Sequence, residues 1–195
     1  MEMRPRETRK KENPIPKGTK QIEKEMKDSI NARLEAWHIK KKEITNKTHP
    51  VNKYPNQRII FDIKPWTLWW FEAGENIGKE IGSHVNEDNS YFFNRPCIII
   101  STIKSLKDTD DSIVTILPMS TKSSGIGIHK HYVYKLEKEK YPKKGKFKGL
   151  KVDSYVICHQ IKTIDTKRLI QMVHERIEEE DIKAIKINMR KYIDI

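Results

Sequence analysis

Apolar positions divide the chain into a helical segment near its N-terminus and a series of short strands after it. From residue 19 to about residue 44, apolar residues recur every three or four positions, so they lie on one stripe of an amphipathic helix. The stripe consists of Ile22, Met26, Ile30, Leu34 and Trp37. We expect it to pack on the chain's own domain or on a second copy, and the basic face with Lys40, Lys41 and Lys42 offers nucleic-acid binding as an alternative.

Five short segments rich in β-branched and aromatic residues follow, and Gly, Asn, Asp and Lys fill the gaps between them. They span residues 67–72, 92–102, 112–119, 131–136 and 154–160. Because no helices alternate with these strands, the pattern predicts a small antiparallel barrel rather than a parallel sheet. Two helices are predicted after the strands, a short one from 165 to about 173 and a longer one over 178–192.

These elements suggest four parts of the chain. Residues 1–18 combine prolines with charges and have almost nothing to bury, which predicts a disordered basic tail. Residues 19–45 form the amphipathic helical extension, and residues 46–63 contain the prolines and polar residues typical of a linker. Residues 64–195 hold the strands and the last helices, and we expect them to form one mainly β domain.

The chain is strongly basic, and the basic residues are unevenly distributed. Lys and Arg outnumber Asp and Glu by 39 to 27, which gives a formal net charge of +12. The first 60 residues carry 16 basic against 8 acidic side chains and so hold two thirds of that surplus. A surplus of this size favours polyanionic partners such as nucleic acid or an acidic peptide.

Hydropathy and cysteine usage indicate the compartment. No apolar run approaches the roughly 18 residues that cross a bilayer, and no apolar segment follows the charged N-terminus as it would in an export signal. We therefore expect a soluble cytoplasmic protein with no membrane partner. Cys97 and Cys158 lie inside apolar strand-like segments, which predicts buried free thiols in a reducing environment.

Four motifs occur in order along the second part of the chain: WWFEAGENIGKE, NRPCIIIS, ILPMSTKS and DSYVICHQIKTIDTKRL. Together they resemble the signature stretches of the MazF/PemK (Kid) toxin family, from about residue 66 to the C-terminus. The resemblance implies an SH3-like barrel that forms a homodimer, cuts single-stranded messenger RNA without metal or cofactor, and is inhibited by an acidic antitoxin protein. The alternative on the same barrel is a non-catalytic nucleic-acid-binding protein or a gyrase inhibitor like the CcdB toxins.

Metal-free RNA cleavage uses the 2′-hydroxyl of the substrate as nucleophile and leaves 2′,3′-cyclic phosphate and 5′-hydroxyl ends. The protein must then stabilise a charged phosphorane and move two protons. Arg95 matches the family's Arg-Pro position, and its guanidinium fork suits a phosphate. The alternative for Arg95 is a surface arginine before a proline. Ser120 matches a position where the family usually has Thr, and either Ser120 or the adjacent Thr121 could donate a hydroxyl hydrogen bond to the phosphate.

His159 departs from the family pattern, which commonly has Asp or Glu at this position. An imidazole has an ordinary pKa of about 6.5 and can perform the same proton transfer, so His159 is a candidate base. A structural histidine is the alternative that stays open. Ile157 stands where part of the family has an additional Arg, which gives Arg95 a larger share of the charge stabilisation.

RNA-binding candidates are mostly basic residues in the loops, together with Glu80 and Gln160. They are Glu80, Lys122, His129, His131, Lys144, Lys146 and Gln160. Tyr141 and Phe147 are interleaved with the later lysines, and aromatic rings beside cations suit unstacked bases and phosphates. Solvated lysines are the alternative. His129 and His131 lack a third ligand at metal spacing, so we expect no metal site.

Overall fold

The computed structural model describes residues 17–46, 63–76, 84–85, 91–92, 94–104, 112–121 and 132–194. Two α-helices, nine strands and two short 3₁₀ turns occur in these residues. In chain order they are α1 Lys17–Thr45, β1 Leu68–Glu72, β2 His84–Val85, β3 Tyr91–Phe92, β4 Asn94–Lys104, β5 Ser112–Ser120, β6 Val133–Leu136, η3 Lys138–Lys140, β7 Ser154–Ile157, β8 Lys162–Asp165, η4 Thr166–Arg168, β9 Leu169–His174 and α2 Glu179–Ile193.

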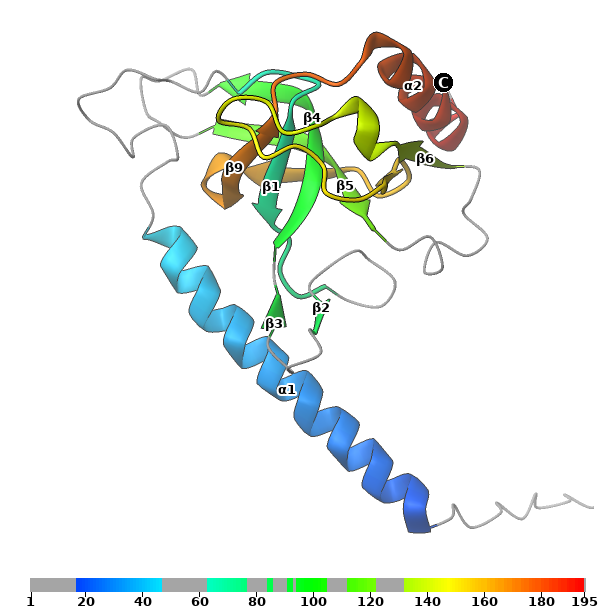
Figure 1. Cartoon of the computed structure of the whole chain (residues 1–195). Helices are drawn as coiled ribbons and strands as arrows, with labels where there is room; N and C mark the ends of the chain where they lie inside the picture. Colours follow the sequence, from blue (N-terminus) through cyan, green and yellow to red (C-terminus); the bar gives the residue numbers. More distant parts are fainter. Residues whose placement is uncertain are drawn as a thin grey trace, which may run out of the picture.

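Seven of these strands form one antiparallel sheet in the order β6-β7-β5-β4-β1-β9, with β8 paired to β5. Strands β2 and β3 form a separate two-stranded sheet. Figure 1 shows a curved, barrel-like body with α2 at its upper side, while α1 runs past its lower end and extends away from it. Among the described strands, the sheet is open between β6 and β9. The mainly β fold with a C-terminal helix and an N-terminal helical extension is confirmed.

The strands bury side chains on both faces of the sheet, because successive residues point to opposite faces. Ile98 belongs to a first core, which also contains residues of β7 and α2. Its neighbours Cys97 and Ile99 belong to a second core, shared with β8 and with Leu169. Cys97 and Cys158 are free and fully buried, as predicted.

The helix predicted from 165 to about 173 is wrong. The structure has only the η4 turn there, followed by strand β9, which pairs with β1. The Asp165 side chain accepts a hydrogen bond from the Lys167 amide and caps the turn, and Leu169 and Val173 are buried while Ile170 is exposed. The sequence pattern missed this strand because its main support is the open edge of β1, which is distant in sequence.

A buried carboxylate fixes α2 to the barrel. Asp181 is 1% exposed and accepts hydrogen bonds from the Tyr134 hydroxyl at 2.6 Å, from the Tyr141 hydroxyl, and from the Lys140 ammonium at 3.2 Å. Burial alone would raise the pKa of Asp181, but these hydrogen bonds outweigh it and hold the pKa below its ordinary value. Three segments of the chain therefore meet at one charged group. None of the described helices is long and apolar enough to cross a membrane.

Replacing Asp181 by Asn should lower the free energy of unfolding at pH 7 by about 1–3 kcal/mol, because buried hydroxyl donors lose their charged acceptor. The depressed folded-state pKa stabilises the protein above the unfolded value of about 3.9, and this contribution disappears as the pH falls through the folded value. Urea unfolding of both proteins from pH 7 to pH 3 should show the gap narrowing below about pH 4. Glu180→Gln, an exposed neighbour, is the control, and an equal loss in both variants would contradict this role.

Candidate functional site

Strand β1 lies between β4 and the edge strand β9, and its pairing with β4 sets the position of Arg95. Phe71 pairs with Arg95 of β4 on one side and with Leu169 of β9 on the other. We call these three residues the Arg95 row. The row places the last residues of β1, the first residues of β4 and the η4 turn at one end of the sheet.

Ser120 belongs to the same end through the pairing of β4 with β5. The last registered pair is Cys97 with Pro118, and Arg95 and Ser120 each lie two residues beyond it along their strands. Cys97 and Ile116 both pack in the second core, so alternation along each strand directs Arg95 and Ser120 to that same face. Thr121 follows as an exposed residue just beyond β5.

Arg95 is half-buried at the start of an apolar strand. Burial lowers the pKa of its guanidinium, although an arginine stays charged at any pH a protein tolerates. Because fewer waters screen a half-buried charge, its attraction for an incoming phosphate is stronger than at an exposed site. The Arg95 end of the sheet is thus suited to hold an anion.

His159 and Gln160 lie in the turn between β7 and β8. The His159 ring contacts Tyr132 and Tyr192 edge-on, with ring centroids 6.3 and 6.0 Å away. Tyr155, which pairs with Ser120, precedes His159 by four residues, and because β7 ends at Ile157 the two backbones are at most about 13 Å apart. His159 is therefore placed by an aromatic group that joins the β7–β8 turn to α2, beyond the β7 residue that pairs with Ser120.

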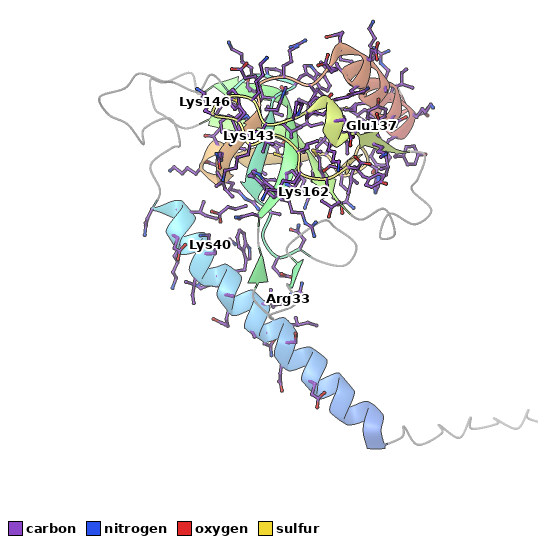
Figure 2. All side chains as sticks on the ribbon, viewed as in Figure 1. Arg33, Lys40, Glu137, Lys143, Lys146 and Lys162 are labelled. Carbon is purple, nitrogen blue, oxygen red and sulfur yellow. The ribbon has the colours of Figure 1, made fainter. Side chains whose placement is uncertain are left out.

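The lysines after β6 lie toward the other end of the sheet. Lys144 and Lys146 are exposed, and their loop is tied to β9 by a hydrogen bond from the Gly149 amide to the Val173 carbonyl. Val173 is four residues, or about 13 Å, from Leu169 in the Arg95 row. In Figure 2, Lys146 lies on the side of the barrel away from α1.

The expectation that Tyr141 and Phe147 offer stacking surfaces for bases is wrong. Tyr141 is fully buried in the first core, and its hydroxyl is bound to Asp181. Phe147 is 9% exposed and lies under the Lys146 ammonium, which is 5.4 Å from its ring centroid. These rings stabilise the loop, so its RNA-binding potential rests on its lysines alone.

Four of the predicted RNA-binding residues lie outside the described residues: Glu80, Lys122, His129 and His131. Within the described part of the chain, no group of three or more His, Cys, Asp or Glu side chains is placed to hold a metal ion. Burial raises the pKa of Cys158 to about 12 and that of Cys97 as well, so neither thiol is activated as a nucleophile.

Sequence reasoning missed the contribution of α1 to this end of the molecule. Trp37 packs against the backbone of Gly74, just after β1, and the Arg168 guanidinium lies over its ring at 5.6 Å from the centroid. Arg168 also donates hydrogen bonds to the Glu72 and Ala73 carbonyls at 2.8 and 2.7 Å. The predicted apolar stripe thus packs on the chain's own domain through its C-terminal part.

Two ion pairs reinforce this contact along α1. Arg33 binds Glu75, and the Lys40 ammonium lies 3.7 Å from the buried Glu72 carboxylate. Figure 2 shows both basic residues on the part of α1 that passes the barrel. Toward the N-terminus the stripe separates from the domain, and Leu34 is 48% exposed. The sequence signal that indicates this docking is Trp37, a large aromatic residue within a basic segment.

The fold and the four motifs define a toxin of the SH3-like barrel class. A family model described as PemK-like, MazF-like toxin of type II toxin-antitoxin system matches residues 64–193. This match covers about two thirds of the chain, and the chain therefore belongs to the PemK/MazF toxin family.

Several solved structures are similar at low identity. The Mycobacterium tuberculosis toxin MazF-mt6 is 17% identical with a TM-score of 0.38, and the match covers 59% of this chain and 98% of that one. A second M. tuberculosis toxin is 16% identical, with a TM-score of 0.35 and coverage of 50% and 91%. An endoribonuclease in complex with its cognate antitoxin, from a mycobacterial species, is 11% identical, with a TM-score of 0.36 and coverage of 67% and 94%. No curated protein sequence matches the chain.

Gly74→Ala should detach α1 from the barrel. Gly74 has a φ of +76°, and a Cβ atom there would collide with the Trp37 indole. Gly145→Ala is the matched control, because Gly145 has a φ of +55° but no atom within 4 Å of its added Cβ. Both variants lose about 1–2 kcal/mol to backbone strain, and the collision should add a further 1–3 kcal/mol, roughly, for Gly74 alone.

Hydrogen exchange of the α1 amides measures this detachment directly. We expect faster exchange over α1 in Gly74→Ala and unchanged exchange there in Gly145→Ala. Equal exchange of α1 in the two variants would show that the indole contact does not hold the helix.

Proposed function

We propose that this toxin is a metal-independent endoribonuclease that cleaves single-stranded messenger RNA. The observation that carries the proposal is the register that directs Arg95 and Ser120 to one face at one end of the sheet. A fixed cation beside a hydroxyl donor is what a scissile phosphate needs for binding and charge stabilisation. Membership of the family and the net charge of +12 support the same reading.

In the proposed reaction the 2′-oxygen attacks the adjacent phosphorus while the bond from phosphorus to the 5′-oxygen breaks. The products are a 2′,3′-cyclic phosphate and a 5′-hydroxyl. Arg95 stabilises the phosphorane by hydrogen bonds to its non-bridging oxygens, and the Ser120 hydroxyl donates a further one. Thr121 is the alternative donor, placed one residue further along.

Two protons move in this reaction, one from the 2′-hydroxyl and one to the departing 5′-oxygen. We propose that His159 shuttles the proton: its imidazole takes one from the 2′-hydroxyl and returns one to the departing 5′-oxygen. Its place in the aromatic group with Tyr132 and Tyr192 limits its freedom. The base must come within hydrogen-bond reach of the 2′-hydroxyl, so the substrate has to extend from the Arg95 row toward the β7–β8 turn.

The proposed partners follow from charge and from exposed apolar surface. An acidic antitoxin would complement the basic barrel, and the surplus of Lys and Arg supports this. We also propose a homodimer, because α2 exposes Ile187, Tyr192 and Ile193 at 51%, 47% and 45% and such surface favours association. The buried free thiols suit a reducing cytoplasm.

Arg95→Ala should lower kcat for RNA cleavage by roughly 100-fold or more, because a fixed charge on the phosphorane is lost. The measurement is digestion of a mixed RNA pool in EDTA, with the new ends mapped. Arg190→Ala, an exposed arginine of α2, is the control and should cut at the wild-type rate.

A wild-type protein that binds RNA but leaves it intact would contradict the enzyme proposal and favour a non-catalytic binding protein. Trapping of gyrase on DNA would favour a CcdB-like inhibitor instead. An Arg95→Ala variant with full activity would exclude Arg95 from the reaction while leaving the activity itself established.

His159→Gln should lower kcat and remove the limb of the pH–rate profile that depends on the base, because an amide cannot accept the proton. Single-turnover rates from pH 5 to pH 9 provide the profile. His174→Gln is the control, since that half-buried histidine lies outside the aromatic group of His159: its ring packs edge-on against Tyr141, and its Nδ1 lies 2.9 Å from the Arg176 carbonyl oxygen. An unchanged profile in His159→Gln would assign His159 a structural role within the aromatic group.

A further inference from the structure

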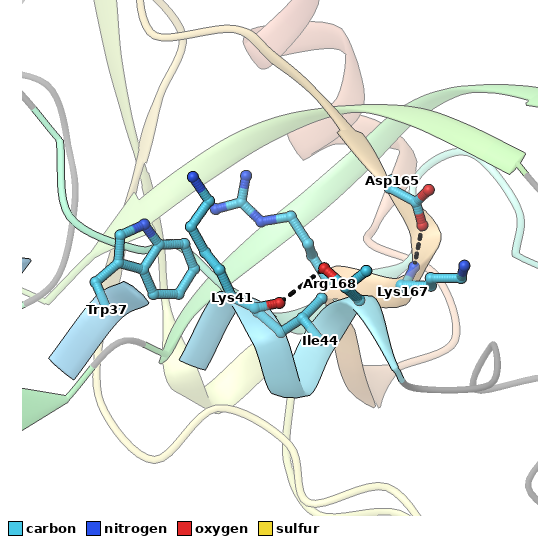
Figure 3. Close-up of a pocket in the computed structure, with 7 residues that line it drawn as sticks. Trp37, Lys41, Ile44, Asp165, Lys167 and Arg168 are labelled. Carbon is cyan, nitrogen blue, oxygen red and sulfur yellow. Dashed lines mark hydrogen bonds between the residues drawn. The ribbon is translucent and has the colours of Figure 1, made fainter. Parts of the chain in front are cut away.

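A cavity of about 260 Å³ lies between α1 and the η4 turn. Figure 3 shows the indole of Trp37 at one side of it and the capped turn of Asp165 and Lys167 at the other. We call this cavity the α1–η4 seam, and its lining residues are Trp37, Lys41, Ile44, Thr45, Asp165, Lys167 and Arg168. Four of them, Trp37, Lys41, Ile44 and Thr45, come from α1, which lies outside residues 64–193.

The seam lies at the same end of the sheet as the Arg95 row. Leu169 ends that row, and Arg168 precedes it directly. The backbones of Arg95 and Leu169 are two strand spacings apart, about 9–10 Å in all. A single RNA strand held at Arg95 therefore has only a short distance to reach the seam.

The seam contains Lys41, a cation that forms no ion pair with the acidic residues of the described chain. Within the described part of the chain, the Lys41 ammonium makes no ion pair, whereas its neighbour Lys40 is bound by Glu43 and lies near Glu72. Arg168 adds a second positive charge, which the buried Glu72 carboxylate partly balances. The Glu72 and Ala73 carbonyls and the Trp37 ring hold this guanidinium in place. Two positive groups that line one cavity repel each other, so an anion between them is favoured.

Asp165 makes the seam selective for more than a bare anion. One oxygen of its carboxylate accepts the Lys167 amide at 2.6 Å, and a carboxylate accepts hydrogen bonds on both oxygens. It would repel a second carboxylate, but it suits the exocyclic amino group of a nucleobase, which is a donor. With Trp37 beside it, the cavity combines a base-binding part with a phosphate-binding part.

We propose that the α1–η4 seam binds one nucleotide of single-stranded RNA next to the scissile bond, with Lys41 on its phosphate and Asp165 on its base. This inference rests on the proposed ribonuclease function and adds a flanking subsite to it. The volume is just below the roughly 300–1,000 Å³ of pockets for drug-sized ligands, which fits one nucleotide rather than a folded peptide. The helix that precedes the toxin domain then contributes directly to substrate choice.

The test compares full-length wild type with Lys41→Gln on an RNA whose cleavage position has been mapped. Lys183→Gln is the matched control, because it removes the same charge from an exposed lysine of the other helix, α2. We expect KM to rise about tenfold in Lys41→Gln with kcat nearly unchanged. The slope of log affinity against log salt should fall by about 0.7, one phosphate of a single strand. Affinity is measured on the same RNA with a 2′-deoxy scissile nucleotide, which is not cut.

Shortening the RNA shows which side of the cleavage position occupies the seam. When the substrate is shortened on the side that reaches the seam, wild type and Lys41→Gln should become equal, while trimming the other side should preserve their difference. A thio-substituted base at that flank should crosslink to the peptide that contains Trp37 and Lys41.

Three results would overturn the subsite. Equal KM values and salt slopes for Lys41→Gln and Lys183→Gln would exclude it while leaving the ribonuclease activity standing. Weaker binding of a polyglutamate peptide by Lys41→Gln, with RNA binding unchanged, would assign the seam to an acidic protein instead. Intact RNA with the wild-type protein would contradict the proposed function, and the subsite would fall with it.

Discussion

The double pairing of β1 is the constraint on which the rest of the molecule depends. Phe71 has Arg95 on one side and Leu169 on the other, so one short strand fixes a row across three strands. The row orients Arg95 toward the second core and places the η4 turn at the same edge. Because all of its residues lie in paired strands, the candidate cation is preorganised rather than carried on a loop.

The same end of the sheet also receives α1, and this changes how the basic extension is understood. Two of its eight basic residues help to dock it: Arg33 faces Glu75 and Lys40 faces Glu72, at and just after the end of β1. Trp37 fits only because Gly74 has no side chain. Lys41, which makes no ion pair within the described residues, therefore lies in a cavity at the same end of the sheet as Arg95.

The sequence predicts the strands and helices that local residue patterns determine. The segment around Ile98 to Ile100 and the helix that ends near Tyr192 were both found, because β-branched runs and helical spacing are local signals. Strand β9 was missed because Leu169 and Val173 depend on the edge of β1 for pairing, and no local pattern reports that edge.

The candidate site divides in the same way. Arg95 is recognisable because an Arg-Pro step before an apolar strand is a visible motif, yet its place at the same end of the sheet as Ser120 needs the register of β4 and β5. The burial of Tyr141 was invisible, since its partner Asp181 lies forty residues further along. In the sequence Lys41 does not differ from its basic neighbours. Only the docking of Trp37 on the domain places Lys41 in one cavity with Arg168.

The most direct test of the account is a double-mutant cycle on RNA cleavage with Arg95→Ala and Ser120→Ala. If the two side chains act on one phosphate, the double variant should lose less in single-turnover rate than the product of the single losses, with a coupling of about 1 kcal/mol or more. Losses that multiply would mean that the two groups act independently, and the shared site at this end of the sheet would be wrong.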